Sequence, residues 1–314
     1  MTTETRVNHR TPWIETPPRA PALRHATAKA IERMPWLDKV SKPVEQWVSQ
    51  FYGQPGEDRY KIKDALNGVW LGHVLHPALV DIPLGAWSAT TMFDLAWLGN
   101  PSEANAKGAD ATLWLGLVGA IGSAVTGLTN WVDTDGPEKR TGMLHGLLNG
   151  GITVLNLASA LLRASGQRRS AITLSTTAFA VSLYSAYLGG DLSYASGVNV
   201  NHVAWYGGPD DFVAVMDVAD LPEGKPKRVD AAGIPAVLVK DGGNIQAIAA
   251  ICSHMGGPLD EGSYADGVIH CPWHNSGFFM CDGSIANSPA VYAQPTFEVR
   301  TRNGKIELRR LEHA

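Results

Sequence analysis

The pattern of apolar and charged positions divides the chain near residue 191. Before this point, four long stretches carry very few charged side chains, and after it the apolar residues occur in short runs separated by Gly, Asp and Asn. An uncharged stretch of about 20 residues is long enough to cross the hydrocarbon core of a bilayer as a helix. The pattern therefore predicts a four-helix transmembrane bundle, which is all-α, followed by a small all-β domain.

The four predicted spans differ in charge. The first contains Asp81, Pro83 and Asp94, and Asp94 is expected to be solvated near the far end of the span. The other three contain no Lys, Arg, Asp or Glu, which is rare over this length in the buried helices of soluble proteins. Small residues recur at intervals that suit close helix packing in lipid, and Trp residues lie mostly near span ends. The spans cover residues 77–98, 112–132, 142–162 and 171–190.

After the spans, the sequence predicts short strands joined by tight turns. Asp241-Gly242-Gly243 and Asn303-Gly304 are typical of two-residue β-hairpin loops. The predicted strands cover residues 212–218, 236–240, 245–251, 267–270, 296–300 and 305–309.

The segment before the first span contains one amphipathic pattern. Its apolar residues recur at helical intervals, with Lys39, Lys42 and Glu45 between them. This pattern predicts a helix that lies in the membrane interface or, alternatively, packs on the β domain. Residues 16–21 have the composition of a disordered linker. The apolar positions are Trp36, Leu37, Val40, Val44, Trp47, Val48 and Phe51.

These patterns together predict four regions. They are an N-terminal tail with the amphipathic helix (1–67), a transmembrane domain (68–190), a linker (191–210) and a C-terminal β domain (211–314).

Two short Cys/His pairs carry the chemistry of the C-terminal domain. Cys252-x-His254 is followed, after 16 residues, by Cys271-x-x-His274. Two thiolates on one iron and two imidazoles on the other are the ligands of a Rieske-type [2Fe–2S] cluster. Zinc is the alternative, since two Cys and two His also form tetrahedral zinc sites, but the Cys-x-His spacing departs from that of zinc fingers.

The residues around these pairs resemble the Rieske ferredoxin family over about residues 211–309. The resemblance rests on the loops Met255–Pro258 and Asn275–Gly277, and on Asn287-Ser-Pro-Ala290, where the family places a Pro-containing loop over the cluster. It implies that His254 and His274 lie near an open tip, where electrons pass to a redox partner. It also implies that Ser276, Trp273, Gly257 and Pro289 surround the cluster.

The resemblance also distinguishes between types of Rieske protein. Gly257 and Trp273 occupy the positions of the disulfide of respiratory members, and Phe278 occupies the position of their Tyr. The third cysteine, Cys281, is expected to be a small buried strand residue. Because only 40 residues follow His274 in the chain of 314, no oxygenase domain is expected after it. The sequence thus predicts an electron carrier or oxidoreductase subunit more than a stand-alone enzyme.

The order of the spans gathers polar residues on one membrane face. In an up-and-down bundle, the starts of spans one and three and the ends of spans two and four share a face. The N-terminal tail and the β domain lie on that face too. The polar residues are His73, His76, Asp81, Asp133, Asp135, His145, Asn149 and Asp191.

Several of these residues belong to motifs similar to a predicted bacterial membrane family, domain of unknown function 2231. The motifs are Gly72-His73-Val-Leu-His76-Pro77, Asp81-Ile-Pro83, the run 127–134 and His145. The resemblance spans about residues 68–200 and implies a membrane architecture without a known activity. Asn130 and Asp191 depart from the pattern expected for that family.

Ionisable residues at membrane depth are candidates for a functional site. Two ligands suit them: haem b, with imidazole ligands such as His76 and His145, or a quinone held by His and Asp. The sequence leaves both open. The candidate set is His73, His76, Asp81, Asp133, His145 and Asn149.

We therefore expect a membrane-anchored Rieske protein that passes single electrons between a cytosolic redox protein and a membrane redox site. The alternatives are a ferredoxin component of an oxygenase system, with the helical domain only an anchor, and a redox-gated transporter. Membrane lipid and a second copy of the chain are further expected partners. The net charge of −4 argues against nucleic acid.

The expected location is a bacterial cytoplasmic membrane crossed several times. Two of the three cysteines are predicted ligands, so no disulfide framework is available. Lys and Arg are slightly more frequent on the tail side of the spans. Both observations favour a cytoplasmic N-terminus and a cytoplasmic Rieske domain.

Overall fold

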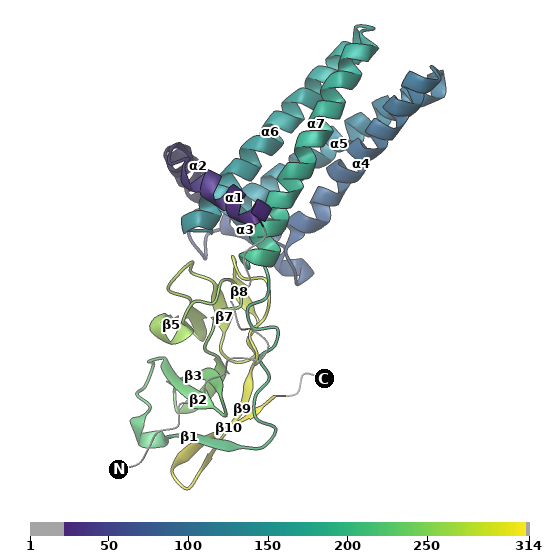
Figure 1. Ribbon diagram of the computed structural model, residues 1–314. Helices are drawn as coiled ribbons and strands as arrows, with labels where there is room; N and C mark the ends of the chain where they lie inside the picture. Colours follow the sequence, from purple (N-terminus) through teal and green to yellow (C-terminus); the bar gives the residue numbers. More distant parts are fainter. Residues whose placement is uncertain (1–21, 312–314) are drawn as a thin grey trace.

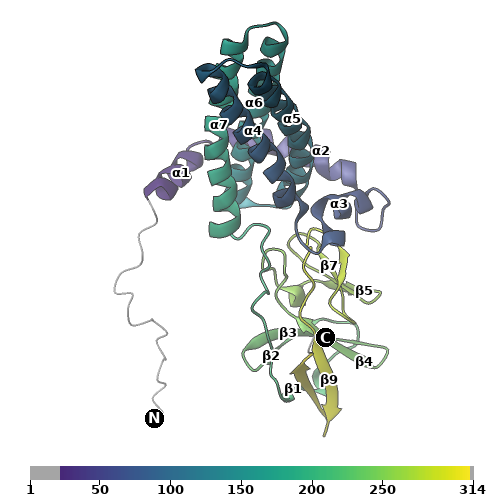
Figure 2. The same ribbon diagram turned by 90° about the vertical axis from the view of Figure 1, so that its right-hand side faces the viewer.

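The computed structural model describes residues 22–311. A bundle of four long helices stands on a small β domain, and three shorter helices lie at the end of the bundle next to that domain (Figures 1 and 2). The predicted linker at residues 16–21 lies outside the described residues.

The bundle consists of α4 (Leu75–Gly99), α5 (Glu103–Trp131), α6 (Gly136–Ala164) and α7 (Arg168–Gly190). Glycines allow these helices to approach closely. A Cβ atom on Gly116 would lie 2.2 Å from the Trp87 ring, and one on Gly119 would lie 2.6 Å from Ile82. The predicted spans therefore correspond to four real helices that pack through small residues.

Three of the helices among residues 22–311 are long and apolar enough to cross a membrane. They are Glu103–Trp131, Gly136–Ala164 and Arg168–Ala195. The α4 helix is not among them, because Asp81 and Asp94 lower its hydropathy. The helical region thus fits a membrane domain with three candidate spans, where the sequence predicted four.

One expectation about the first span is wrong. Asp94 is not solvated: it is fully buried and pairs with Arg163 of α6. Arg163 lies one residue beyond the predicted third span, so its approach to Asp94 was not visible in the sequence.

The N-terminal segment forms α1 (Ala22–Glu32), α2 (Trp36–Tyr52), α3 (Tyr60–Asn67) and a 3-10 turn, η1 (Val69–Leu71). The α2 helix packs on the bundle through Leu37, Ser41 and Val48, which are buried. It exposes Trp47 and Phe51, whose rings stack 6.3 Å apart between centroids. The predicted amphipathic helix therefore exists and packs on the bundle, not on the β domain.

The chain leaves the bundle through a π-helical turn, η2 (Asp191–Ala195), which extends α7. The following segment runs along the β domain. The amide of His202 donates to Ser253 O at 3.1 Å, and the Tyr292 hydroxyl donates to Asn199 O at 3.2 Å. The linker is therefore attached to the β domain and adds little freedom to it.

The β domain contains three antiparallel sheets with the strand orders β1-β10-β9, β2-β3-β4 and β5-β6-β7-β8. Both predicted hairpin turns are confirmed: β3 pairs with β4 around Gly242 and Gly243, and β9 pairs with β10 around Asn303 and Gly304. All four turn residues have positive φ, as this type of hairpin requires.

The strands are β1 (Val213–Asp217), β2 (Lys227–Ala231), β3 (Ile234–Asp241), β4 (Asn244–Ala249), β5 (Ser263–Ala265), β6 (Val268–His270), β7 (Gly277–Phe279), β8 (Ile285–Asn287), β9 (Phe297–Arg302) and β10 (Lys305–Arg310). The sequence did not predict β2, β5, β7 or β8, three of which have only three residues.

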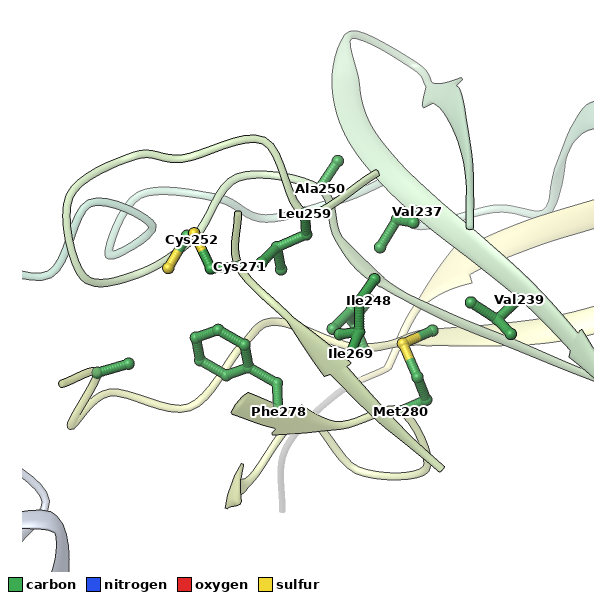
Figure 3. Close-up of a cluster of buried hydrophobic side chains, with 11 residues drawn as sticks. Val237, Val239, Ile248, Ala250, Cys252, Leu259, Ile269, Cys271, Phe278 and Met280 are labelled. Carbon is green, nitrogen blue, oxygen red and sulfur yellow. The ribbon is translucent and has the colours of Figure 1, made fainter. Parts of the chain in front are cut away.

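A compact apolar core supports the sheets. Figure 3 shows the two neighbouring cysteines Cys252 and Cys271 at one end of this core, with Leu259 beside them, Phe278 below them and Ile269 further along it. These residues are all at most 4% exposed. Both cysteines thus belong to the buried core.

Candidate metal centre

Two loops with similar internal hydrogen bonds present the Cys/His pairs. In the first, the Cys252 amide donates to Gly257 O at 2.8 Å and the Gly256 amide donates to Cys252 O at 3.0 Å. In the second, the Cys271 amide donates to Ser276 O at 2.9 Å and the Asn275 amide donates to Cys271 O at 3.0 Å. Positive φ angles at Gly256 and Asn275 allow both loops to turn this tightly. Each ligand loop is therefore rigid on its own.

The two thiols lie side by side and are buried. Their mutual hydrogen bond, together with burial, raises the pKa of Cys252 well above its usual value. The same hydrogen bond lowers the pKa of Cys271 to about 6. The pair thus shares a proton that a metal would displace, since thiolates are the ligating form.

The two imidazoles also lie together. The rings of His254 and His274 meet edge to face, with centroids 5.0 Å apart. Burial, followed by the nearby His274, lowers the pKa of His254 to about 3, so this ring is neutral at pH 7. Nδ1 of His274 is buried and has no hydrogen-bond partner among residues 22–311. A buried nitrogen without a partner is costly, and a metal would satisfy it.

These observations fit a two-iron centre. The thiols form one pair and the imidazoles another, as the Rieske arrangement requires. Within the described part of the chain, no group of three or more His, Cys, Asp or Glu side chains converges as ligands for a single ion. The tetrahedral zinc alternative needs such a group.

The residues predicted around the cluster are close to the ligands. A Cβ atom on Gly257 would lie 2.7 Å from Cys271 Sγ and 3.1 Å from the Trp273 ring, so only Gly fits there. The Ser276 hydroxyl contacts the Cys252 thiol and accepts from the Ala290 amide at 3.1 Å. That second contact holds the loop containing Pro289, which is buried beside the ligand loops.

The histidine edge is not an open tip, contrary to expectation. His254 is only 5% exposed and the His274 side chain only 12% exposed. Nε2 of His274 lies 2.7 Å from a carboxylate oxygen of Asp135, in the loop between α5 and α6. The helical region therefore covers the edge that was expected to face a partner.

The covering surface, which we call the docking face, is made by α3 and the α5–α6 loop. The Tyr60 hydroxyl donates to Ser288 O at 3.0 Å, and the Ser288 amide donates to a carboxylate oxygen of Asp64 at 2.8 Å. Behind these contacts, Lys63 pairs with Asp133 at 2.8 Å. The docking face comprises Tyr60, Lys63, Asp64, Asp133 and Asp135.

The ion pair of the docking face is largely buried, with 8% of the Lys63 side chain and 12% of the Asp133 side chain exposed. Burial raises the pKa of Asp133, and Lys63 opposes this effect. Burial also works against the Lys63 ammonium, but the charges of Asp133 and Tyr60 outweigh it and raise the pKa of Lys63.

The predicted membrane residues separate into different environments. His145 lies inside the bundle, where Nδ1 lies 2.8 Å from Ser185 O and Nε2 lies 3.1 Å from Asn149 Nδ2. Nδ1 of His76 lies 3.3 Å from the Thr126 hydroxyl, and the ring packs on Gly127, where a Cβ atom would lie 2.7 Å away. His76, His145 and Asn149 are thus polar side chains between the helices, and we call them the internal polar group.

The other members of the candidate set do not join this group. His73 and Asp81 are exposed, and His73 contacts only Val74 O at 3.1 Å. Asp133 belongs to the docking face. Asp191, outside the set, pairs with Arg24 at 2.7 Å. Cys281 was expected to be a buried strand residue, but it is exposed because it lies in the turn before β8.

The α3 helix was not predicted from the sequence. Its polar residues follow helical spacing, with Tyr60, Lys63, Asp64 and Asn67 on one face. Such a stripe normally faces water, and its only signal was that the opposite side carries Ile62, which is 45% exposed. An apolar residue on the outer side of a polar helix was the clue to a buried polar stripe.

A small β domain that presents paired thiols and paired imidazoles defines an electron-transfer protein of the iron–sulfur type. The Rieske [2Fe-2S] domain model matches residues 211–298, and the predicted membrane protein model DUF2231 matches residues 72–202. The chain belongs to the Rieske [2Fe–2S] family through its C-terminal domain and carries a predicted membrane domain before it.

Three relatives illustrate the range of this family. Ferredoxin CarAc of Metapseudomonas resinovorans is 30% identical, over 30% of this chain and 90% of its own length. The 3-phenylpropionate/cinnamic acid dioxygenase ferredoxin subunit of Escherichia coli (strain K12) is 34% identical, over 28% of this chain and 84% of its own length. Apoptosis-inducing factor 3 of Homo sapiens is 32% identical, but over 35% of this chain and only 18% of its own length.

Proposed function

We propose that Cys252, His254, Cys271 and His274 ligate a [2Fe–2S] cluster in a membrane-anchored electron-transfer protein. A bound cluster of this kind accepts and releases one electron at a time. The observation that carries the proposal is the buried Nδ1 of His274, which has no partner among residues 22–311, beside the neutral His254 ring and the paired thiols. The chain's own groups thus offer two sulfur and two nitrogen donors in the required pairing.

The proposal divides the chain as the sequence predicted. Residues 1–67 form the N-terminal segment with its interfacial helix, 68–190 the transmembrane domain, 191–210 the linker and 211–314 the Rieske domain. In this arrangement α4 completes four spans, because it packs along α5 and α7. We place the protein in a bacterial cytoplasmic membrane, with its N-terminus and Rieske domain on the cytoplasmic side.

The electron partner on the membrane side is proposed to lie at the internal polar group. His76 of α4 and His145 of α6 lie close enough to interact electrostatically, on the Rieske side of the bundle. Haem b would need a free ring nitrogen on each histidine, whereas the nitrogens of His145 already lie within hydrogen-bond distance of Ser185 and Asn149. A quinone would likewise need a free N–H of His145, so either ligand would have to displace one of these contacts.

Metal analysis tests the cluster assignment. We expect iron and acid-labile sulfide in equal amounts in the purified protein, and a rhombic electron paramagnetic resonance signal after reduction. Cys271→Ser should remove both. Stoichiometric zinc without sulfide would refute the assignment.

Reoxidation kinetics test the membrane site. In detergent, His145→Ala should slow oxidation of the pre-reduced cluster by a soluble quinone analogue and leave its spectrum unchanged. Asn156→Ala is the matched control, because Asn156 is a buried polar residue on the same helix whose side chain, within the described residues, bonds to Ile152 O of its own helix. Haem absorption bands that are present in the parent and absent in His145→Ala would show that the ligand is haem and not a quinone. Equal rates in parent, His145→Ala and His76→Ala would reduce the helical domain to an anchor.

Equal reoxidation rates in these three proteins would favour the second candidate function, a ferredoxin component of an oxygenase system. The observation that supports it is the 34% identity to a dioxygenase ferredoxin subunit across 84% of that protein. This candidate predicts that an oxygenase, supplied with electrons through the Rieske domain alone, turns over as fast as with the full chain.

A further inference from the structure

The docking face covers the edge of the metal centre through which the histidines would meet another protein. His254 is 5% exposed, and Nε2 of His274 is occupied by Asp135. Efficient electron transfer between proteins requires their redox groups to come close, so a soluble protein cannot reach the imidazoles in this arrangement without displacing the helical region.

The contacts of α3 are specific to one loop of the Rieske domain. Tyr60 donates to the carbonyl oxygen of Ser288, and Asp64 accepts from the amide of the same residue. Binding both backbone groups of one residue fixes the position of the loop that covers the ligands. A hydrogen bond to a charged carboxylate is stronger than one between neutral groups, so the Asp64 contact is the stronger of the two.

The buried stripe of α3 faces both the end of the bundle and the Rieske domain. A helix that buries Lys63 and Asn67 and exposes Ile62 is unfavourable by itself, because the polar groups lose water and the apolar group gains it. The partners of the stripe outside α3 are Ser288 of the Rieske domain and Asp133 and Asn130 at the end of the bundle. The side-chain nitrogen of Asn67 has no partner among residues 22–311. Residues 60–67 also lie outside both matched ranges, 72–202 and 211–298.

We propose that α3 is a docking element that closes the histidine edge to soluble redox proteins, so that electrons exchanged at this edge pass between the Rieske domain and the helical region of the same chain. This inference rests on the proposed function, because it requires a cluster at the four ligands. It goes beyond that function by assigning a role to a helix that neither family covers, and by excluding one class of partner from one face of the domain.

Hydrogen exchange tests the docking role without relying on electron transfer. In the full-length holoprotein in detergent, amides of residues 285–292 should be protected, and Asp64→Ala should make them exchange roughly tenfold faster, since about 1.4 kcal/mol corresponds to a factor of ten. Tyr60→Phe should act in the same direction with a smaller effect. Asp58→Ala is the matched control, because Asp58 is exposed beside the same helix and pairs only with Lys61.

Oxidation by a soluble protein tests the closure. The cluster is first reduced with dithionite, the excess reductant is removed, and one electron per cluster then passes to ferric cytochrome c, which becomes ferrous. We expect Asp64→Ala and Tyr60→Phe to react several-fold faster than the parent and Asp58→Ala. The small oxidant ferricyanide should react at similar rates with all four proteins.

The outcomes separate the two proposals. Faster amide exchange with an unchanged cytochrome c rate would overturn closure, and unchanged exchange in both variants would overturn the docking role. A faster oxidation by cytochrome c in Asp58→Ala would also overturn the closure, because Asp58 pairs with Lys61 and not with a residue of the Rieske domain. A parent protein without the rhombic iron signal would instead refute the proposed function.

Discussion

The two ends of the helical bundle differ in the partners of their buried polar groups. At the end far from the Rieske domain, Arg163 binds the Asp94 carboxylate with both terminal nitrogens and also contacts Asp110 at 3.2 Å. Asp110 in turn pairs with Arg168 at 2.7 Å. These four residues come from α4, α5, α6 and α7, so one charged network joins all the helices of the bundle.

At the end near the Rieske domain, the histidines contact neutral groups, and the charged residues pair with segments outside the bundle, as Asp133 does with Lys63 of α3. His76 and His145 contact hydroxyl, amide and carbonyl groups, and Asp135 contacts His274 of the Rieske domain. A closed network of paired charges is suited to holding helices together, because breaking any pair leaves a buried charge. Neutral groups lose less free energy when they change hydrogen-bond partners, and this suits ligand binding and electron transfer. We therefore assign stability to the far end and function to the near end.

The largest effect is expected from breaking the far network. Arg163→Met should lower the free energy of unfolding by about 3–5 kcal/mol, because Asp94 stays buried without its partner. Thermal unfolding in detergent should show this as a midpoint several degrees lower. Arg169→Met, an exposed arginine on α7, should change little. A loss below about 1 kcal/mol in Arg163→Met would contradict the assignment of stability to this end.

A smaller effect is expected at the docking face. Lys63→Met should weaken it by about 2–3 kcal/mol, because Asp133 loses its partner, and exchange at residues 285–292 should report this. Because the folded state raises the pKa of Lys63, its contribution is complete below the unfolded pKa and is lost as pH rises through the folded value. Protection in the parent should therefore decline above about pH 10.4.

In Lys63→Met this alkaline decline should be absent, and Lys61→Met, which changes an exposed lysine of the same helix, should keep it. A decline of equal steepness in Lys63→Met would show that another group controls the docking face at high pH.

The smallest effect is expected on the reduction potential. The Asp135 carboxylate beside His274 Nε2 draws the ring proton toward itself and disfavours added negative charge on the cluster. Asp135→Asn should raise the potential by about 20–60 mV, since 59 mV corresponds to a factor of ten for one electron. Redox titration followed by circular dichroism measures this. Glu138→Gln removes a nearby charge from the same region, and an equal rise there would point to general electrostatics instead of the contact.

Local patterns were predictable from the sequence, and long-range partnerships were not. The ligand spacing at 252–274 and the uncharged spans are each contained in a short segment, so both could be recognised. The pairing of Asp94 with Arg163 joins residues 69 positions apart, and that of Tyr60 with Ser288 joins residues 228 positions apart. No local signal indicates such contacts, which is why Asp94 was expected in solvent and the histidines at an open tip.

Strands of three residues were missed for a related reason. The segments of β5 and β7 are too short for apolar alternation to be seen, and their backbone pairs only because neighbouring strands position it. The polar stripe of α3 has the pattern of a solvated helix face, and in the sequence only Ile62 on the opposite side distinguishes it.

The separation of 228 residues between Tyr60 and Ser288 also bears on biogenesis. A ribosome that has made α3 and the whole bundle has not yet made the loop that α3 binds. At a synthesis rate of about 5–20 residues per second, the stripe stays without this partner for on the order of ten seconds or more. During this interval the polar stripe of α3 is uncovered on the new helical domain, and completion of the Rieske domain covers it. A chain whose ligand loops fail to fold would keep this stripe exposed. The exposed stripe would allow chaperones and proteases to distinguish the misfolded chain from the mature protein.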